Sequence, residues 1–259
     1  QSVSRADRVF HLAAAVGVQY IIDNTLESIE INTQGTENIL CAANRDKTPV
    51  FIASTSEIYG KNENIPFSEE DDRVLGTTTI SRWSYSCTKA LDEFLALAFW
   101  REKQLPVIIG RFFNTVGPRQ TGRYGMVIPK FVKQALLGRE ITVHGDGGQT
   151  RAFMDVDDTT DAVIKLMDKK CWGEIFNIGG SQQVSIEELA KKIIRQVGSS
   201  STLKYIPYEE AFESGFEDMR HRVPDTSKLE KEIDFKQSHD LEDILNRVIN
   251  YFRSNEGFQ

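Results

Sequence analysis

Short apolar runs alternate with longer amphipathic segments along the chain. The runs predict strands at residues 8–13, 50–54, 106–112 and 174–178. Pro49-Val50-Phe51-Ile52-Ala53 has no polar alternation, which is typical of a strand buried on both faces of a parallel sheet. Apolar positions that repeat every three to four residues predict helices at 27–43, 83–103, 126–137, 158–168, 186–197 and 241–253. This order predicts an α/β fold with right-handed crossovers and a parallel sheet.

Tyr85 and Lys89 stand four positions apart on the predicted helix 83–103. Residues at this spacing share a helix face, roughly 5–6 Å apart at Cβ, so the ammonium lowers a phenol pKa that is otherwise about 10. Such a tyrosine suits the removal of a proton from a sugar hydroxyl. The same spacing also occurs as a purely structural pair in amphipathic helices.

The setting of this pair favours the chemical interpretation. Thr55, Ser56 and Glu57 directly follow the strand predicted at residues 50–54. They therefore lie at a carboxyl end of the sheet, where ligands bind in open α/β folds.

Several ordered blocks give the chain a family resemblance. They lie at residues 9–14, 32–36, 54–60, 85–89, 111–119, 149–156, 176–179 and 221–229. With these blocks the chain resembles the extended short-chain dehydrogenase/reductase family, within it the NAD-dependent nucleotide-sugar epimerases, decarboxylases and dehydratases. The resemblance implies a Rossmann-like doubly wound parallel sheet with a smaller C-terminal substrate-binding domain. It assigns residues 1–116 and 151–180 to NAD binding, and 117–150 and 181–259 to the nucleotide sugar.

One departure from the family pattern is large. Its members open with a glycine-rich turn that holds the cofactor pyrophosphate, and this sequence shows no such turn. Gly145–Gly148 and Gly179-Gly180 follow the wrong elements and are interpreted as turns. We expect the chain to be an N-terminally truncated Rossmann domain that lacks roughly 60 residues, two βα units of about 30 each. The strand at Val9 is then an exposed apolar edge, and the chain alone is expected to aggregate or to bind NAD poorly.

The resemblance also implies roles for the motif residues. Tyr85 takes the proton from the sugar 4-hydroxyl while a hydride passes to the nicotinamide, and Lys89 binds the nicotinamide ribose and keeps Tyr85 ionised. Thr55 or Ser56 hydrogen-bonds the same sugar oxygen, and capping of the strand end is the alternative role for either hydroxyl. Glu57 is a further catalytic candidate, with a supporting hydrogen-bond role as its alternative.

Two more groups of residues are implied to bind ligands. The cofactor channel is lined by Leu12, Ala13, Ala14 and Ser54, with Asn32 close to the cofactor. The alternative for Asn32 is a cap or a buried hydrogen bond. The diphosphate is approached by Asn114, Arg151 and Arg222, with Arg119 also in reach of the substrate, because guanidinium groups bind phosphate through paired hydrogen bonds.

Ser56 narrows the choice among the reactions that this family catalyses. Dehydratases of the family carry an Asp-Glu pair here, and this chain has Ser56-Glu57. Glu57 occurs in both glucuronate decarboxylases and glucuronate 4-epimerases. The segments 81–85 and 215–219 resemble epimerases, so NAD-dependent 4-epimerisation of UDP-glucose or UDP-glucuronate through a 4-keto intermediate is the expected reaction. UDP-glucuronate decarboxylation and an inactive nucleotide-sugar-binding remnant are the alternatives.

Composition is that of ordinary globular material, at 40% hydrophobic and 27% charged residues with a net charge of −7. The acidic balance argues against nucleic-acid binding. Cys41, Cys87 and Cys171 are widely spaced, which indicates reduced thiols in a cytoplasmic protein without a metal site. No apolar run is long enough for a membrane span. By resemblance, the helices 27–43 and 83–103 form a homodimer interface, and their burial within one chain is the alternative.

Overall fold

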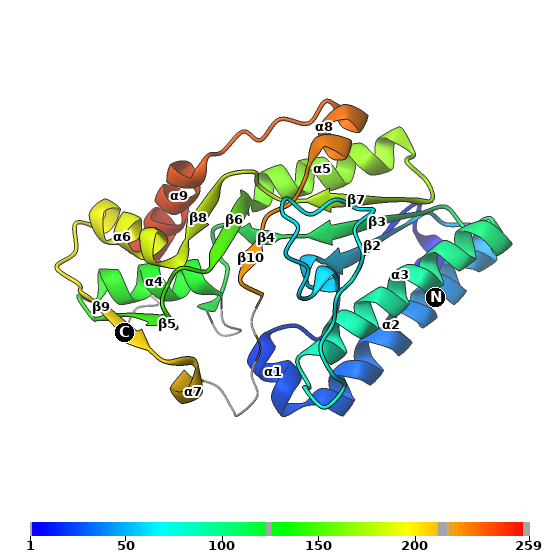
Figure 1. Ribbon diagram of the computed structural model, residues 1–259. Helices are drawn as coiled ribbons and strands as arrows, with labels where there is room; N and C mark the ends of the chain where they lie inside the picture. The colour runs from blue at the N-terminus through cyan, green and yellow to red at the C-terminus, as the bar shows by residue number, and fades with distance from the viewer. Residues whose placement is uncertain (1, 123–125, 212–216, 218, 256–259) are drawn as a thin grey trace.

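The four predicted strands form one parallel sheet in the order β1-β2-β3-β7 (Figure 1). The computed structural model describes residues 2–122, 126–211, 217 and 219–255. The strands run over Val9–His11 (β1), Val50–Thr55 (β2), Val107–Phe112 (β3) and Glu174–Ile178 (β7). This confirms the α/β fold and the parallel sheet expected from the sequence.

Helices cover both faces of this sheet (Figure 1). One face carries α2 (Thr25–Asp46) and α3 (Trp83–Lys103), and the other carries α5 (Val156–Lys169) and α8 (Ser227–Ile233). Alternate strand residues supply the two cores, since Ile52 packs with the α2–α3 side and Phe51 with the α5–α8 side. The unbroken apolar run of β2 is therefore explained by burial on both faces.

β1 lies at one edge of the sheet within the described residues. Phe10 and Leu12 leave 41% and 59% of their surfaces exposed there. The exposed apolar edge expected from the sequence is confirmed.

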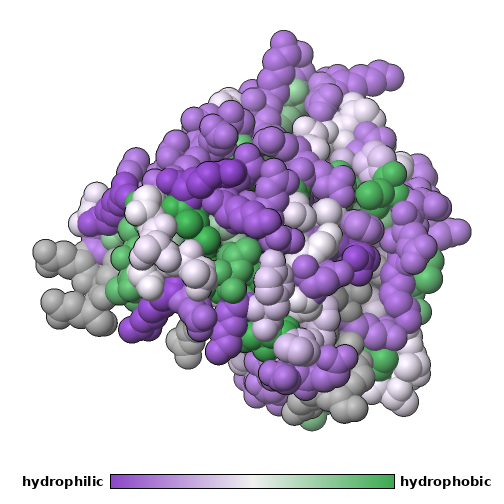
Figure 2. All heavy atoms as spheres, turned by 60° about the vertical axis from the view of Figure 1, so that its left-hand side comes forward, coloured by the Kyte–Doolittle hydropathy of each residue, from purple (hydrophilic) through white to green (hydrophobic). Residues whose placement is uncertain are grey.

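A second layer packs beside the carboxyl end of the sheet. It contains α4 (Val127–Leu136), α6 (Ile186–Val197) and α9 (Leu241–Ser254), which share one apolar core. Figure 2 brings this side forward and shows small hydrophobic groups among hydrophilic residues, as expected for helices that bury one face. The helices have clear ends: Ser185 caps α6, Gly198 ends it at φ 70°, and Asp240 forms a capping box on α9.

Short strands join this layer to the site. β10-β6-β4 are parallel, β8 is antiparallel to β6, and β5 pairs with β9. Their bounds are β4 Asn114–Val116, β5 Ile141–His144, β6 Thr150–Asp155, β8 Gln183–Ser185, β9 Leu203–Ile206 and β10 His221–Arg222. The sequence pattern had not predicted these strands.

The remaining elements are short. They are α1 (Val18–Asp23), α7 (Tyr208–Ala211) and the 3₁₀ helices η1 (Val3–Arg5) and η2 (Ser56–Tyr59). The six predicted helices are confirmed to within a few residues at each end. Within the described part of the chain, none of the helices has the length and apolar character that crossing a bilayer requires.

Candidate active site

The site begins where β2 ends beside the first turn of α3. Tyr85 is partly buried near the start of α3, and it hydrogen-bonds the Thr55 hydroxyl at the end of β2. The Thr55 oxygen also accepts the backbone N–H of Glu57 at 3.2 Å, which caps η2. Of the two roles expected for Thr55, the structure shows the cap, and the hydrogen bond to the sugar oxygen stays a prediction.

The pKa of Tyr85 lies well above its ordinary value. Burial is the largest cause and the negative charge of Glu57 is the next, whereas the Thr55 hydrogen bond and the charge of Arg222 act in the opposite direction. The tyrosine therefore keeps its proton at neutral pH in this state. The ionised Tyr85 expected from the sequence belongs to the NAD-bound site and stays a prediction.

Lys89 is held by a carboxylate on its own helix. Its Nζ donates to Asp92 Oδ2 at 2.8 Å, and both side chains are almost fully buried. Asp92 lies one turn further along α3, on the face that Lys89 occupies. The observed partner of Lys89 is thus Asp92, and its effect on the Tyr85 phenol stays a prediction.

The Lys89–Asp92 pair continues to the sheet edge. Asp92 hydrogen-bonds Thr36 of α2, whose hydroxyl is 3.2 Å from His11 Nε2 at the end of β1. Burial raises the pKa of Asp92, and the Lys89 charge opposes this rise. Burial, followed by the Lys89 charge, lowers the pKa of His11. The neutral imidazole is thus favoured at this position.

Glu57 lies between two arginines. Its Oε1 is 3.1 Å from Arg222 Nη1 and 3.6 Å from Arg82 Nη2. Arg222 also donates through Nη2 to Asn114 Oδ1 at 3.0 Å. Segments far apart in sequence thus bring Arg222 into contact with Glu57 and Asn114, and the charge of Arg222 also acts on Tyr85. Ser56, 2% exposed, lies beside Glu57 on η2.

The two other predicted substrate arginines differ from Arg222. Arg151 is next to Arg222 in strand register, but its Nη1 donates to the backbone oxygens of Thr150 and Arg220. Arg119 is exposed, with φ 70°, and its positive charge contributes to lowering the pKa of Asp157 at the start of α5. The charge of Arg119 thus acts on the start of α5, and its predicted approach to the substrate stays a prediction.

The predicted cofactor residues border β1 and β2. After β1, Leu12 and Ala13 are exposed and Ala14 is partly buried. Asn32 is buried on α2 and hydrogen-bonds the backbone of Ala15, the residue after Ala14. It accepts the N–H of Ala15 at 2.7 Å and donates to its carbonyl oxygen at 3.3 Å. The alternative of a buried hydrogen-bonding role for Asn32 is thus the one that this structure displays.

A buried ion pair beneath the site was missed by the sequence reasoning. Glu93 on α3 receives Arg111 Nε at 3.1 Å and Nη2 at 2.9 Å, and it accepts the Ser54 hydroxyl at 2.5 Å. Arg111 continues to the Tyr59 hydroxyl, which donates to Asn177. A charged residue inside the apolar strand 107–112 was the available signal, since such a charge needs a buried partner.

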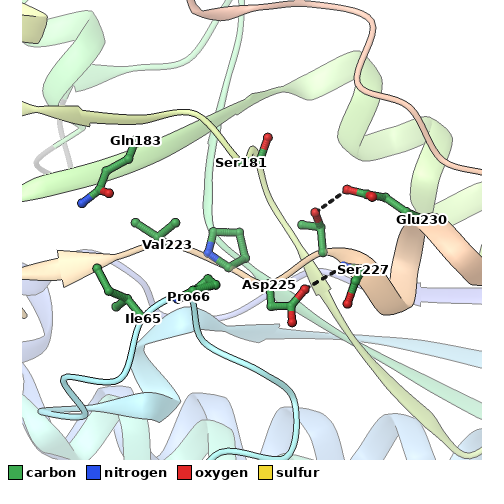
Figure 3. Close-up of a pocket in the computed structure, with 10 residues that line it drawn as sticks. Ile65, Pro66, Ser181, Gln183, Val223, Asp225, Ser227 and Glu230 are labelled. Carbon is green, nitrogen blue, oxygen red and sulfur yellow. Dashed lines mark hydrogen bonds between the residues drawn. The ribbon is translucent and has the colours of Figure 1, made fainter.

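A surface hollow of about 400 Å³ lies apart from these residues (Figure 3). Ile65, Pro66 and Val223 give it apolar walls. Polar groups that line it hydrogen-bond to one another: Asp225 accepts the N–H of Ser227, and the Thr226 hydroxyl donates to Glu230. None of the predicted catalytic residues lines it. Among the described residues no cluster of His, Cys, Asp and Glu side chains suits a metal ion.

Comparison with known proteins gives consistent results. The family model described as GDP-mannose 4,6 dehydratase matches residues 2–248. The chain is 45% identical over 255 residues to UDP-N-acetyl-alpha-D-glucosaminuronate decarboxylase of Bacillus cytotoxicus, covering 98% of this chain and 79% of that protein. It is 33% identical over 250 residues to UDP-glucuronic acid decarboxylase 1 of Xenopus tropicalis, covering 95% of this chain but only 57% of that protein.

Solved structures also share the fold. UDP-glucuronic acid 4-epimerase from Bacillus cereus, in complex with UDP-glucuronic acid and NAD, superposes with a TM-score of 0.86 at 26% identity. The match covers 98% of this chain and 77% of that one. This agreement confirms the Rossmann-like fold class.

Proposed function

The chain belongs to the GDP-mannose 4,6 dehydratase family, an extended short-chain dehydrogenase/reductase family, and from that premise we propose that it is an NAD-dependent UDP-hexuronate decarboxylase. Its substrate class is UDP-glucuronate or the N-acetylated relative. The sequence alone favoured 4-epimerisation and kept decarboxylation as an alternative. The alternative has more support, because the relatives at 45% and 33% identity carry decarboxylase names.

One structural observation carries the proposal. Arg222 is fixed by Glu57 at 3.1 Å and by Asn114 at 3.0 Å, and its positive charge acts on Tyr85. A guanidinium group held in this way matches a carboxylate by paired, charge-assisted hydrogen bonds. A hexuronate carries such a carboxylate at C6, two bonds from the carbon that is oxidised, whereas the sugar ring of a UDP-hexose has no carboxylate. We therefore propose that Arg222 contacts the hexuronate rather than the diphosphate expected from the sequence.

The residues after β1 and β2 fit the nicotinamide half of a dinucleotide. Ala13 and Ala14 are small and accessible, Leu12 exposes apolar surface, and Lys89 lies on the neighbouring helix face. Ala13, Ala14, Ser54 and Lys89 would hold the cofactor there. NAD, when bound, supplies the acceptor and later the donor of a hydride.

Tyr85 and Thr55 act on the sugar O4. Tyr85 takes the proton of the 4-hydroxyl, and Thr55, already its hydrogen-bond partner, holds the same oxygen. Because burial keeps Tyr85 protonated in the resting state, the tyrosine must first lose its proton. Lys89 favours that loss when its ammonium turns from Asp92 toward the phenol, since a nearby positive charge lowers a phenol pKa.

Decarboxylation follows from the chemistry of the 4-keto sugar. Its C6 carboxylate is β to the ketone, so the C5–C6 bond breaks, CO₂ leaves, and the electron pair moves onto O4 as an enolate. Tyr85 and Thr55 donate hydrogen bonds to that oxygen. A proton from solvent is added to C5 through the Ser56 hydroxyl, while Glu57 remains the carboxylate that holds Arg222. Reduction at C4, with the Tyr85 proton returned to O4, completes a UDP-pentose.

The assembly is also proposed. Leu26 and Ile31 of α2 and Leu91 and Phe94 of α3 are exposed by 71%, 45%, 53% and 62%. Burial of such side chains stabilises association, and we propose a homodimer through α2 and α3.

Two further expectations are retained as proposals. We propose that residues 1–116 and 151–180 bind NAD and that 117–150 and 181–259 bind the UDP-sugar, with α8 counted with the first group because it packs on α5. We also propose a reducing, cytoplasmic compartment, since Cys41, Cys87 and Cys171 are free thiols.

The test is a product analysis. The protein is incubated with NAD and UDP-glucuronate, UDP-N-acetylglucosaminuronate or UDP-glucose labelled with ¹³C at C6, and NMR follows the label. Labelled CO₂ and a UDP-pentose that disappear in Tyr85→Phe, with Tyr251→Phe on α9 as the active control, support decarboxylation. Inversion at C4 with the carboxylate retained would instead establish the epimerase, and tight binding without turnover would establish the binding remnant.

A further inference from the structure

Arg82 is the second guanidinium group on Glu57. It stands directly before α3, three residues before Tyr85, and its side chain is 4% exposed. Its Nη2 lies 3.6 Å from Glu57 Oε1, the same oxygen that Arg222 Nη1 contacts at 3.1 Å. Arg222 is the more accessible of the two arginines, at 17%. One carboxylate is therefore shared between a buried cation and a cation closer to solvent.

The surroundings hold Arg82 in this position. Its guanidinium lies 5.8 Å from the centre of the Trp83 ring, a cation–π distance. Trp83 in turn donates through its indole N–H to Glu217 at 2.8 Å, and Lys61 pairs with Glu217 at 3.0 Å. A planar guanidinium group can pack on the indole and still direct one nitrogen at Glu57, which an ammonium group does less well.

The other buried ion pairs near the site have a different arrangement. Lys89 contacts Asp92, and Arg111 contacts Glu93 in a bidentate pair. In both, one cation meets one carboxylate. Glu57 instead contacts two arginines, Arg82 and Arg222, so its single negative charge neutralises Arg222 only in part.

We propose that Arg82 is a positioning residue, which draws Glu57 toward the protein interior and so leaves Arg222 able to bind the carboxylate of a hexuronate. This inference rests on the proposed function, and it concerns the selection of charged over uncharged sugars. Without Arg82, Glu57 pairs with Arg222 alone, and the guanidinium group loses its attraction for a substrate anion. The binding of a UDP-hexose, whose sugar carries no carboxylate, does not depend on this division.

Calorimetric binding of UDP-glucuronate and UDP-glucose to the NAD-loaded protein tests the inference. Arg82→Gln is expected to weaken UDP-glucuronate about ten- to a hundredfold, from the loss of one charge interaction at a partly buried site, and UDP-glucose less than about twofold. Arg82→Lys keeps the charge but not the planar group, and it recovers only part of the affinity. Arg101→Gln, exposed on the same helix, is the matched control and changes neither ligand.

The double variant Glu57→Gln/Arg82→Gln separates positioning from simple support of the fold. It frees Arg222 from the carboxylate, so the preference for UDP-glucuronate returns although both side chains are altered. Equal weakening of both sugars in Arg82→Gln, no weakening of either, or a double variant that stays as weak as Arg82→Gln would overturn the inference. A wild-type protein without preference for UDP-glucuronate would instead overturn the proposed function.

Discussion

The Glu93–Arg111 pair allows a quantitative test of the fold beneath the site. Replacing Arg111 by Met leaves the Glu93 carboxylate, 6% exposed, with the Ser54 hydroxyl as its hydrogen-bond donor. Two charge-assisted hydrogen bonds at 3.1 and 2.9 Å are lost, each worth about 1.5–3 kcal/mol. Removing one partner of a buried pair costs about 3–5 kcal/mol. We expect Arg111→Met to lower the free energy of unfolding by that amount.

The paired variant distinguishes the loss of the charge interaction from the loss of side-chain packing. In Glu93→Leu/Arg111→Met neither charge of the pair remains. We expect the free energy of unfolding to return to within about 1–2 kcal/mol of the wild type, because apolar replacements of a buried pair are often close to neutral. Urea titrations followed by circular dichroism and tryptophan fluorescence give the four corners of the double-mutant cycle.

An exposed pair provides the control. Asp161→Asn removes the partner of Lys165 on α5, where both side chains are about half exposed. The midpoint of its urea unfolding curve is expected to equal that of the wild type within experimental error. A loss below about 1 kcal/mol in Arg111→Met, or single effects that simply add in the double variant, would refute the reasoning from burial.

Three further predictions follow from other parts of the molecule. The pKa of His11 is lowered from 6.5 in the folded state, so folding disfavours the protonated imidazole. The stability that neutral His11 contributes is therefore present above pH 6.5 and is lost as the pH falls. His11→Gln should flatten the pH dependence of the free energy of unfolding between about pH 5 and 7, and an unchanged slope would contradict this. Phe94→Asp should convert the proposed dimer to a monomer in light scattering, whereas Ile164→Asp, at an exposed apolar residue on α5, should not. A dimeric Phe94→Asp would place the interface elsewhere. Asp240→Ala removes the capping box of α9 and should cost about 1 kcal/mol in thermal unfolding without changing turnover, and a loss of turnover would show that α9 also supports the site.

The sequence predicted the central sheet well because its strands are buried on both faces. A run such as Val50–Ala53 has one interpretation once its length and flanks are considered. The small strands of the second layer were missed because they are two to six residues long and mix polar with apolar positions. β6, Thr150–Asp155, was noticed only as a motif, although it pairs with β4, β8 and β10.

The site was predicted in its residue types more than in its contacts. Thr55 and Tyr85 do meet, because β2 ends beside the first turn of α3, and Glu57 just after β2 pairs with Arg222 of β10. The partner of Lys89 was not predictable from spacing, since Tyr85 at i−4 and Asp92 at i+3 lie on the same helix face and burial decides between them. A buried charged side chain pairs with an oppositely charged side chain when one is within reach.

The separation of Glu57 and Arg222 by 165 positions has a consequence for synthesis. A ribosome adds about 5–20 residues per second, so Arg222 is made roughly 10 to 30 s after Glu57. β2 is complete before that interval begins, and the start of α3 follows early in it, whereas β10 comes at its end. All four strands of the central sheet are therefore synthesised before the Glu57–Arg222 pair can form.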